Sequence, residues 1–362
     1  LLNVPGEKKP LVAHFYGTTK EKMTISSKEE MEKIEKDLKG AAYQVTDVKK
    51  GERVKKAPLP FTTSTLQQEA SKVLNFSTQK TMRIAQQLYE GVEIKGSGTV
   101  GLITYLRTDS TRVSEEAEAM SHKFITENYG GEYAADVHTK EKEGKKIQDA
   151  HEAIRPTDIE RVPSEIKDSL SREQFRLYQL IWKRFTASRM ASAVYETTSV
   201  KIDANGYRFT VAASKVKFDG FMSVYTQEED EKAEGNKLLG SLDEHTKLSW
   251  ESFDSKQHFT QPPAHYTEAS LVRALEEQGI GRPSTYAPTI TTILARRYIV
   301  KEAKNLYVTE LGEAVNNIMK TAFPSIVDVS FTANMESLLD SVEEGGVNWK
   351  VVVSNFYPDL HE

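Results

Sequence analysis

The chain has 362 residues, a formal net charge of −5 and no cysteine. This length allows two or three domains with buried cores. The absence of cysteine excludes disulfides and cysteine-based zinc sites and fits a reducing cytoplasm. No run approaches the roughly 20 apolar residues of a membrane-spanning helix, and the N-terminus has no signal peptide. We therefore expect a cytoplasmic protein, and the absence of an initiator Met predicts a fragment or a processed chain.

The negative charge is concentrated in two stretches. Residues 227–245 contain seven acids and two lysines, and residues 323–362 contain seven acids and one lysine. Both are typical of solvated loops or helix faces. Consecutive acids rarely converge on one ion, so residues 228–231 predict no metal site. The rest of the chain has more basic than acidic residues, so the net charge does not exclude a nucleic-acid partner.

Secondary-structure signals change along the chain. Residues 1–64 combine short strands with one helix, and residues 192–258 alternate at period two, with a turn signal at Asn205-Gly206. The other two segments are mostly helical. This order predicts a multidomain α+β fold in three parts: a discontinuous β-rich domain of residues 1–64 plus 192–258, a helical domain of residues 65–191, and a helical domain of residues 259–362.

The densest polar cluster is GLITYLRTDSTRVS, which contains Tyr105. If the segment is a strand, Arg107 and Asp109 share a face with this tyrosine. A phenol oxygen can attack phosphorus while a guanidinium neutralises the non-bridging oxygens. The alternative is a packed tyrosine beside a surface arginine, since the chain has 15 tyrosines and most must be structural.

A second cluster is DAHEAIRPTD, where His151 and Arg155 are spaced i, i+4. On a helix, this spacing places both on one face. His151 could position a phosphate or transfer a proton, and Arg155 could hold another phosphate. A hydrogen-bond cluster at a helix end between domains explains the spacing equally well.

The third pattern, in residues 259–308, predicts two helices followed by a hairpin, the layout of a winged helix-turn-helix. Arg282, Ser284 and Thr285 stand at the start of the second helix, where backbone N–H groups, two hydroxyls and a cation can hold a phosphate. An ordinary helical hairpin is the alternative. Tyr266 and Tyr286 could stack on bases, although burial in the core explains them as well.

These segments, in this order, resemble those of bacterial type IA DNA topoisomerases of the topoisomerase I kind. The resemblance covers the chain from about residue 55 onward and rests on four motifs. They read PLPFTTSTLQQEASKVLNFSTQKTMRIAQQLYEG, GLITYLRTDSTRVS, DAHEAIRPTD and EEQGIGRPSTYAPTITTI. The resemblance implies a toroid with a discontinuous antiparallel β arch, and two mostly helical domains with winged-helix-like units.

The resemblance also assigns roles to residues. It implies that Tyr105 is the nucleophile that cleaves one DNA strand and holds its 5′ phosphate while another strand passes. Arg107 and His151 match the positions at the scissile phosphate. The remaining matches imply DNA contact: Asp109, Arg155, Arg282, Ser284 and Thr285. We therefore expect a monomeric, ATP-independent enzyme of the bacterial nucleoid that binds single-stranded DNA and relaxes negatively supercoiled DNA.

One family feature has no counterpart in this sequence. The family's N-terminal TOPRIM domain supplies a Glu and a DxD set that bind Mg²⁺, and C-terminal DNA-binding repeats follow the toroid. Neither segment matches these 362 residues. We therefore expect this chain alone to bind single-stranded DNA but to cleave or relax DNA poorly. Two alternatives stay open: a non-catalytic winged-helix DNA-binding scaffold, and a topoisomerase III-like decatenase.

Overall fold

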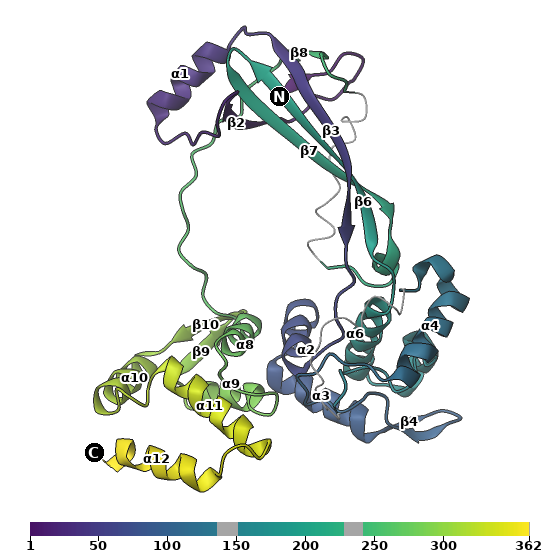
Figure 1. Ribbon diagram of the computed structural model, residues 1–362, viewed down its shortest axis with the longest axis vertical. Coiled ribbons are helices and arrows are strands. Elements are labelled where there is room, and N and C mark those ends of the chain that lie inside the picture. Colours follow the sequence, from purple (N-terminus) through teal and green to yellow (C-terminus); the bar gives the residue numbers. More distant parts are fainter. Residues whose placement is uncertain (136–150, 228–241, 362) are drawn as a thin grey trace. The chain divides into compact units, whose positions relative to one another are not determined.

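Figure 1 shows the computed structural model, which describes residues 1–135, 151–227 and 242–361. The chain forms two compact units, each assembled from segments that are far apart in sequence. The β unit comprises Leu1–Ala57, Glu132–Ala135 and Met190–Gln261, and the helical unit comprises Pro58–Gly131, Asp136–Arg189 and Pro262–Glu362. The three-domain division and the toroid stay predictions. The acidic run at 228–231 lies outside the described residues.

The β unit contains an antiparallel sheet of six strands in the order β1-β8-β3-β6-β7-β2. Its longest hairpin pairs β6 (Ala193–Ala204) with β7 (Tyr207–Phe218). Asn205 and Gly206, with φ of 47° and 81°, form the turn, so the predicted antiparallel segment and its turn are confirmed. The other elements are β1 (Leu2–Asn3), β2 (His14–Thr18), α1 (Lys28–Leu38), β3 (Tyr43–Lys55), β8 (Lys247–Trp250) and the short helix η5 (Gly220–Ser223).

The core of the β unit lies between α1 and the sheet. Helix α1 begins at Ser27, whose side chain accepts a hydrogen bond from the backbone N–H of Glu30. Its apolar residues Ile34 and Leu38 are buried together with Val45 of β3. The period-3.6 pattern of the helix and the period-2 pattern of the strand therefore meet on one apolar surface.

The helical unit contains all of the candidate site residues. Ser77, Ser114 and Ser171 cap its main helices, because each side chain accepts a hydrogen bond from the backbone N–H three residues later. The elements before residue 190 are α2 (Thr63–Glu69), the π-helix η1 (Ala70–Leu74), α3 (Thr78–Glu90), β4 (Val92–Ile94), β5 (Gly98–Val100), α4 (Glu115–Tyr129), η2 (Gly131–Tyr133), α5 (Pro163–Ile166), η4 (Lys167–Ser169) and α6 (Arg172–Ser188).

The second part of the helical unit has the predicted order of two helices and a hairpin. Val272, Tyr286 and Ile290 form its small core. Its assignment as a winged helix stays a prediction. Its elements are α8 (Glu268–Glu277), α9 (Tyr286–Ala295), β9 (Ile299–Glu302), β10 (Asn305–Val308), α10 (Glu310–Ala322), α11 (Val329–Glu343) and α12 (Trp349–His361).

The strand predicted around Tyr105 is wrong. Residues 102–106 form a loop, and its one described bridge joins Ile103 to Pro156. The apolar residues of this segment are nevertheless buried, because Leu102 and Ile103 are each only 1% exposed. The apolar residues that suggested a strand are therefore buried by neighbouring segments and not by pairing in a sheet.

The helical face predicted for residues 151–155 is also wrong. This segment is extended, and a bridge joins Ile154 to Phe61. The physical reason is Pro156, whose ring disfavours the α-helical conformation for Arg155. His151 and Arg155 therefore do not lie on one helical turn.

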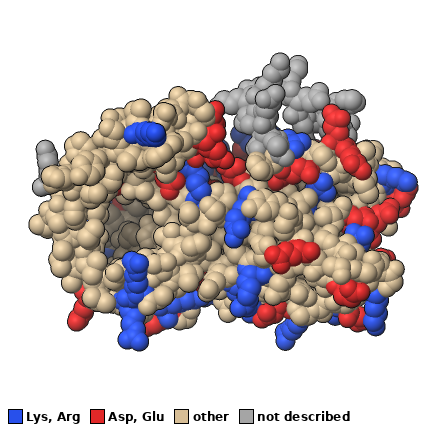
Figure 2. Space-filling model, turned by 90° about the horizontal axis from the view of Figure 1, so that it is seen from below, with Lys and Arg blue, Asp and Glu red and all other residues tan. Residues whose placement is uncertain are grey.

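Charge is mixed on one face of the molecule. On the face that Figure 2 shows, basic and acidic side chains are interspersed, so neither sign forms a continuous patch there. Among the described helices, none has the length and apolar character that crossing a bilayer requires.

Candidate active site

Tyr105 lies on a loop that the helical unit holds at both ends. Before it, the backbone N–H of Leu102 donates to the carbonyl of Leu88 in the last turn of α3, at 2.8 Å. The N–H of Thr104 donates to the carbonyl of Arg155, at 2.9 Å. The residue directly before the tyrosine is thus fixed to a segment 51 positions away.

Beyond Tyr105, the loop is bound to the first residue of α2. The Thr63 hydroxyl donates to the carbonyl of Leu106 at 2.6 Å. The Thr63 N–H donates to the carbonyl of Thr108, and the Thr108 N–H donates back to the Thr63 hydroxyl oxygen, both at 2.9 Å. These three bonds join the loop to α2 without any strand pairing.

Burial alternates along the loop. Tyr105, Arg107 and Asp109 are exposed, whereas Leu106 and Thr108 are buried. The sequence predicts this alternation from a strand, but here the bonds to Thr63 produce it. The three polar side chains assigned to DNA chemistry are therefore accessible, and the residues between them hold the loop on the core.

The ring of Tyr105 contacts the ring of Tyr89, which lies in the last turn of α3. Their centroids are 5.5 Å apart with an interplanar angle of 67°, an edge-to-face geometry that aromatic pairs favour. Tyr105 remains 43% exposed and Tyr89 40% exposed. The contact restricts how the Tyr105 side chain can turn while leaving it open to a ligand.

Arg107 differs from the other two arginines with an assigned role. Its exposed side chain has no hydrogen bond or ion pair within the described part of the chain. Arg155 and Arg282, in contrast, each bind a carboxylate through two nitrogens. Arg107 is therefore the arginine nearest Tyr105 in sequence whose charge is available to a phosphate.

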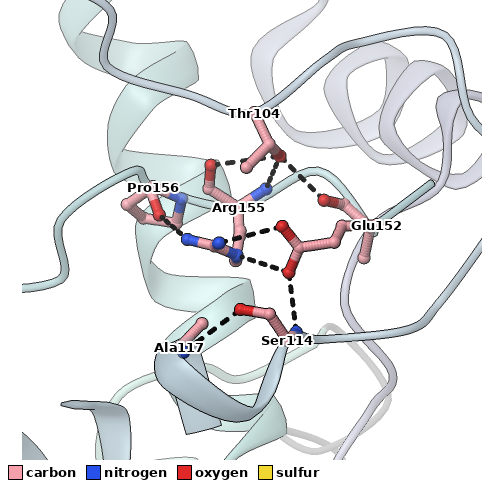
Figure 3. A network of polar contacts seen from close by, with 7 residues as sticks. Thr104, Ser114, Ala117, Glu152, Arg155 and Pro156 are labelled. Atoms are coloured by element: carbon pink, nitrogen blue, oxygen red, sulfur yellow. Dashed lines mark hydrogen bonds and ion pairs between the residues drawn. The ribbon is translucent and has the colours of Figure 1, made fainter. Parts of the chain in front are cut away.

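The guanidinium of Arg155 is bound on several sides (Figure 3). Its Nε and Nη2 donate to the two carboxylate oxygens of Glu152, at 3.2 and 3.0 Å. Its Nη1 donates to the carbonyl of Pro156, at 3.0 Å. Paired and bidentate contacts of this kind are the stronger hydrogen bonds of proteins.

The same network reaches the tyrosine loop and α4 (Figure 3). Oε1 of Glu152 accepts a hydrogen bond from the backbone N–H of Ser114, the cap of α4, at 2.7 Å. The Thr104 hydroxyl donates to the carbonyl of Ala153 at 2.7 Å and accepts from the N–H of Arg155 at 3.0 Å. Residues 152–155 thereby connect the loop before Tyr105 with the start of α4.

The charge state of Glu152 makes part of this stability depend on pH. Partial burial alone raises the pKa of Glu152, but hydrogen bonds from Arg155 and from the Ser114 N–H hold it below its ordinary value. A lowered carboxyl pKa stabilises the fold above the ordinary value, near pH 4.3, and this stability is lost as the pH falls through the lowered pKa. We expect the melting temperature of the wild type to exceed that of Glu152→Gln at pH 6–7, and the difference to shrink as the pH falls through the lowered pKa of Glu152. A constant difference in calorimetry across this range contradicts the role of the ion pair.

Arg282 is also bound within the fold. Its Nη2 and Nε donate to the carboxylate of Asp340 on α11, at 2.7 and 3.2 Å, and these bonds raise the pKa of Arg282. Its Nη1 donates to the carbonyl of Gly281, at 2.7 Å. The predicted phosphate site therefore contains a cation that already has an acidic partner.

Thr285 is the N-terminal cap residue of α9, but its side chain makes no capping bond. Its hydroxyl oxygen instead accepts a hydrogen bond from the N–H of Arg282, at 2.9 Å. Ser284 is exposed. The start of α9 therefore has no side-chain cap, but two of its first three residues offer no N–H to an anion, because the Tyr286 N–H donates to the carbonyl of Arg282 and Pro288 has none.

The Tyr105 loop and the start of α9 lie close enough to interact electrostatically. Tyr286 is 5% exposed, and burial raises its pKa to about 12. The negative charges of Glu276 and Asp109 contribute to this rise in pKa, and the positive charge of Arg282 opposes it. Because Tyr286 is in the core, its stacking on bases is excluded, whereas Tyr266 is 52% exposed.

His151 is exposed and directly precedes Glu152, so the network of Figure 3 fixes the backbone next to it. The described residues contain no group of three His, Asp or Glu side chains that could hold a metal ion.

Sequence reasoning missed the partners of the site residues. Thr63, Tyr89 and Asp340 position Tyr105 or Arg282, but each lies in a helix whose pattern is that of ordinary packing. Only Glu152 could have been predicted as a partner from the sequence, because it lies three residues before Arg155 and the two side chains can therefore meet locally.

Two comparisons bear on these residues. The family model described as DNA topoisomerase matches residues 6–354. The chain belongs to the DNA topoisomerase family. Its structure is similar to that of full-length topoisomerase I from Thermotoga maritima, with a TM-score of 0.83 and 39% sequence identity over 95% of this chain. These matches confirm the resemblance to bacterial type IA topoisomerases.

The topoisomerase match also covers 55% of the Thermotoga maritima chain, so these 362 residues span about half the length of that enzyme. All four motifs lie inside the matched residues. The activity of a complete enzyme is therefore a proposal for this chain.

Proposed function

We propose that the chain is the part of a DNA topoisomerase I that carries the nucleophile, Tyr105. Its phenol oxygen attacks a backbone phosphorus of single-stranded DNA, the bond from phosphorus to the 3′ oxygen breaks, and the 5′ phosphate stays on the tyrosine. The phenol proton leaves, and the departing 3′ oxygen gains one. The supporting observation is an exposed tyrosine on an anchored loop, two residues before an arginine that has no acidic partner among the residues described.

Resealing reverses these bonds. The 3′ hydroxyl attacks the phosphotyrosine, the phosphodiester forms again, and the phenol is released with a proton. The phosphotyrosine preserves the bond energy, so no nucleotide hydrolysis is required. Passage of another strand between the two steps relaxes negative supercoils, and we propose that the protein acts as a monomer at the bacterial nucleoid.

Three side chains support the chemistry in this proposal. Arg107 neutralises charge on the non-bridging oxygens as it develops in the transition state. His151 contacts the same phosphate region and can transfer a proton. Asp109 lies on the exposed side of the loop beyond Arg107, where it contacts the bound strand.

We propose that Mg²⁺ is held by residues outside this chain, as the family resemblance implies; among the described residues, no group of three His, Asp or Glu side chains could hold a metal ion. The 362-residue chain is therefore expected to bind a single-stranded oligonucleotide but to relax supercoiled plasmid poorly, with or without added Mg²⁺. Gel-based relaxation and fluorescence anisotropy measure the two properties. Relaxation by this chain alone, at the rate of the complete gene product, contradicts this expectation.

The start of α9 is proposed to contact single-stranded DNA through Ser284, Thr285 and Arg282. The Arg282–Asp340 pair is 29% and 49% exposed, more than the 14% and 21% of Arg155 and Glu152, so a phosphate can reach Arg282 more easily. Arg282→Ala is expected to weaken oligonucleotide binding for all sequences and to reduce the slope of log affinity against log salt by about 1. Asp340→Asn is the matched control, since it removes the acidic partner but keeps the cation, and its affinity should stay equal or rise. Unchanged affinity of Arg282→Ala at low salt removes this residue from the binding site.

The deciding experiment is mass spectrometry of the complete gene product trapped on DNA. Trypsin releases residues 96–107, and we expect this peptide to carry a nucleotide on Tyr105. Absence of any adduct favours the alternative of a DNA-binding scaffold, which the helix–helix–hairpin order of α8 to β10 supports. Decatenation faster than relaxation favours the topoisomerase III-like alternative.

A further inference from the structure

The Glu152–Arg155 ion pair is placed between the tyrosine loop and α4. We propose that Glu152 and Arg155 are positioning residues, which hold the backbone before Tyr105 in its reactive place, and that Arg155 makes no contact with DNA. This inference rests on the proposed function, since it concerns a reacting Tyr105. It replaces the expectation that Arg155 binds a phosphate.

The first argument is the occupancy of the Arg155 side chain. All three guanidinium nitrogens donate to protein oxygens, two on Glu152 and one on Pro156. The side chain is 14% exposed and that of Glu152 is 21% exposed. Three of the five guanidinium N–H bonds are thus used, and the small exposed fraction leaves little room for a phosphate at the other two. A phosphate that displaced Glu152 would leave a half-buried carboxylate without its cation, which is unfavourable.

The second argument is the set of segments that the pair joins. The backbone of Arg155 exchanges hydrogen bonds with Thr104, and the carboxylate of Glu152 accepts from the N–H of Ser114. The side-chain pair thus fixes the conformation of residues 152–155 between two partners. Without it, both the Thr104 backbone and the start of α4 lose an anchor.

The third argument is the distance to the chemistry. Thr104 directly precedes Tyr105, and consecutive Cα atoms are about 3.8 Å apart, so a shift of one moves the other. A misplacement of about 1 Å reduces a reaction rate by up to about 10²-fold. The pair can therefore control cleavage without contacting the substrate.

The experiment compares Glu152→Gln, Arg155→Lys and Arg155→Met in the complete gene product. For each, we measure oligonucleotide affinity with its salt dependence, and the rate of adduct formation at saturating oligonucleotide. Arg155→Lys keeps the charge but cannot form the bidentate contact. We expect all three variants to form adduct about tenfold more slowly, with affinity within about twofold of the wild type and an unchanged salt slope.

Asp203→Asn provides a matched control. Arg208 binds Asp203 through Nε and Nη2, and their side chains are 20% and 21% exposed, so geometry and burial closely match those of the proposed pair. This pair lies in the hairpin of the β unit. Its loss should leave both affinity and adduct rate unchanged.

Two results overturn the inference. In the first, Arg155→Met binds the oligonucleotide more weakly and its salt slope falls by about 1, while Glu152→Gln forms adduct at the normal rate. This pattern indicates that Arg155 contacts a phosphate. The second is unchanged hydrogen exchange at the Thr104 amide in Glu152→Gln. Hydrogen exchange is measured without DNA, so it tests the positioning role even if the wild type forms no adduct. The absence of an adduct in the wild type would refute the proposed function and not the positioning role.

Discussion

Tyr105→Phe is expected to abolish the covalent DNA adduct, with a loss of more than about 10³-fold in cleavage. The substitution removes only the phenol oxygen that attacks phosphorus. The ring remains, and with it the edge-to-face contact with Tyr89 and the burial of the loop. Fold and oligonucleotide affinity should therefore be unchanged while the adduct disappears from denaturing gels.

The control for this variant is Tyr357→Phe, which removes the hydroxyl of an exposed tyrosine on α12. It should form adduct at the wild-type level. An adduct that persists in Tyr105→Phe rejects the assignment of the nucleophile. Mass spectrometry of that adduct then identifies the residue that carries the DNA.

Arg107→Gln is expected to reduce the rate of cleavage by about 10²- to 10³-fold, the usual effect of removing a donor that stabilises transition-state charge. The reason is structural, since Arg107 is exposed and no described carboxylate neutralises it. Single-turnover cleavage of a single-stranded oligonucleotide measures the effect. Affinity should fall much less, because the interaction strengthens as charge develops.

Arg107→Lys tests whether charge alone is sufficient. A lysine keeps the positive charge but not the planar fork, so we expect partial recovery of the Arg107→Gln defect. Arg208→Gln in the β unit is the control for loss of an arginine and should cleave normally. A wild-type rate in Arg107→Gln excludes this residue from the transition state.

Local patterns predicted the elements whose formation depends on local chemistry. The hairpin around Asn205-Gly206 follows from period-2 alternation and a turn that accepts positive φ. The start of α3 follows from Ser77, which needs only a backbone N–H three residues later. The helices and hairpin of residues 268–308 follow from the same rules.

The site itself depends on contacts between distant residues, which no local pattern contains. Tyr105 lies on a loop because residues far away in the sequence form hydrogen bonds with the backbone on either side of it. Thr63 bonds to Leu106, 43 positions away, and Arg155 bonds to Thr104, 51 positions away. The spacing of His151 and Arg155 suggested a helix, and Pro156 prevents it. Motif resemblance identified Arg107 and Arg282 in the same way. It could not show that Arg282 is paired with a carboxylate, because that partner, Asp340, is 58 positions away.

The long-range bonds of the Tyr105 loop also set an order for folding. Its anchors come from α2, the end of α3 and residues 152–155, so the loop reaches its final conformation only after these segments have met. Closing such long loops is slow compared with forming a single helix. Newly made chains are therefore expected to have helices before the Tyr105 loop is ordered, and the proposed cleavage to become possible only after α2, α3 and residues 152–155 have met.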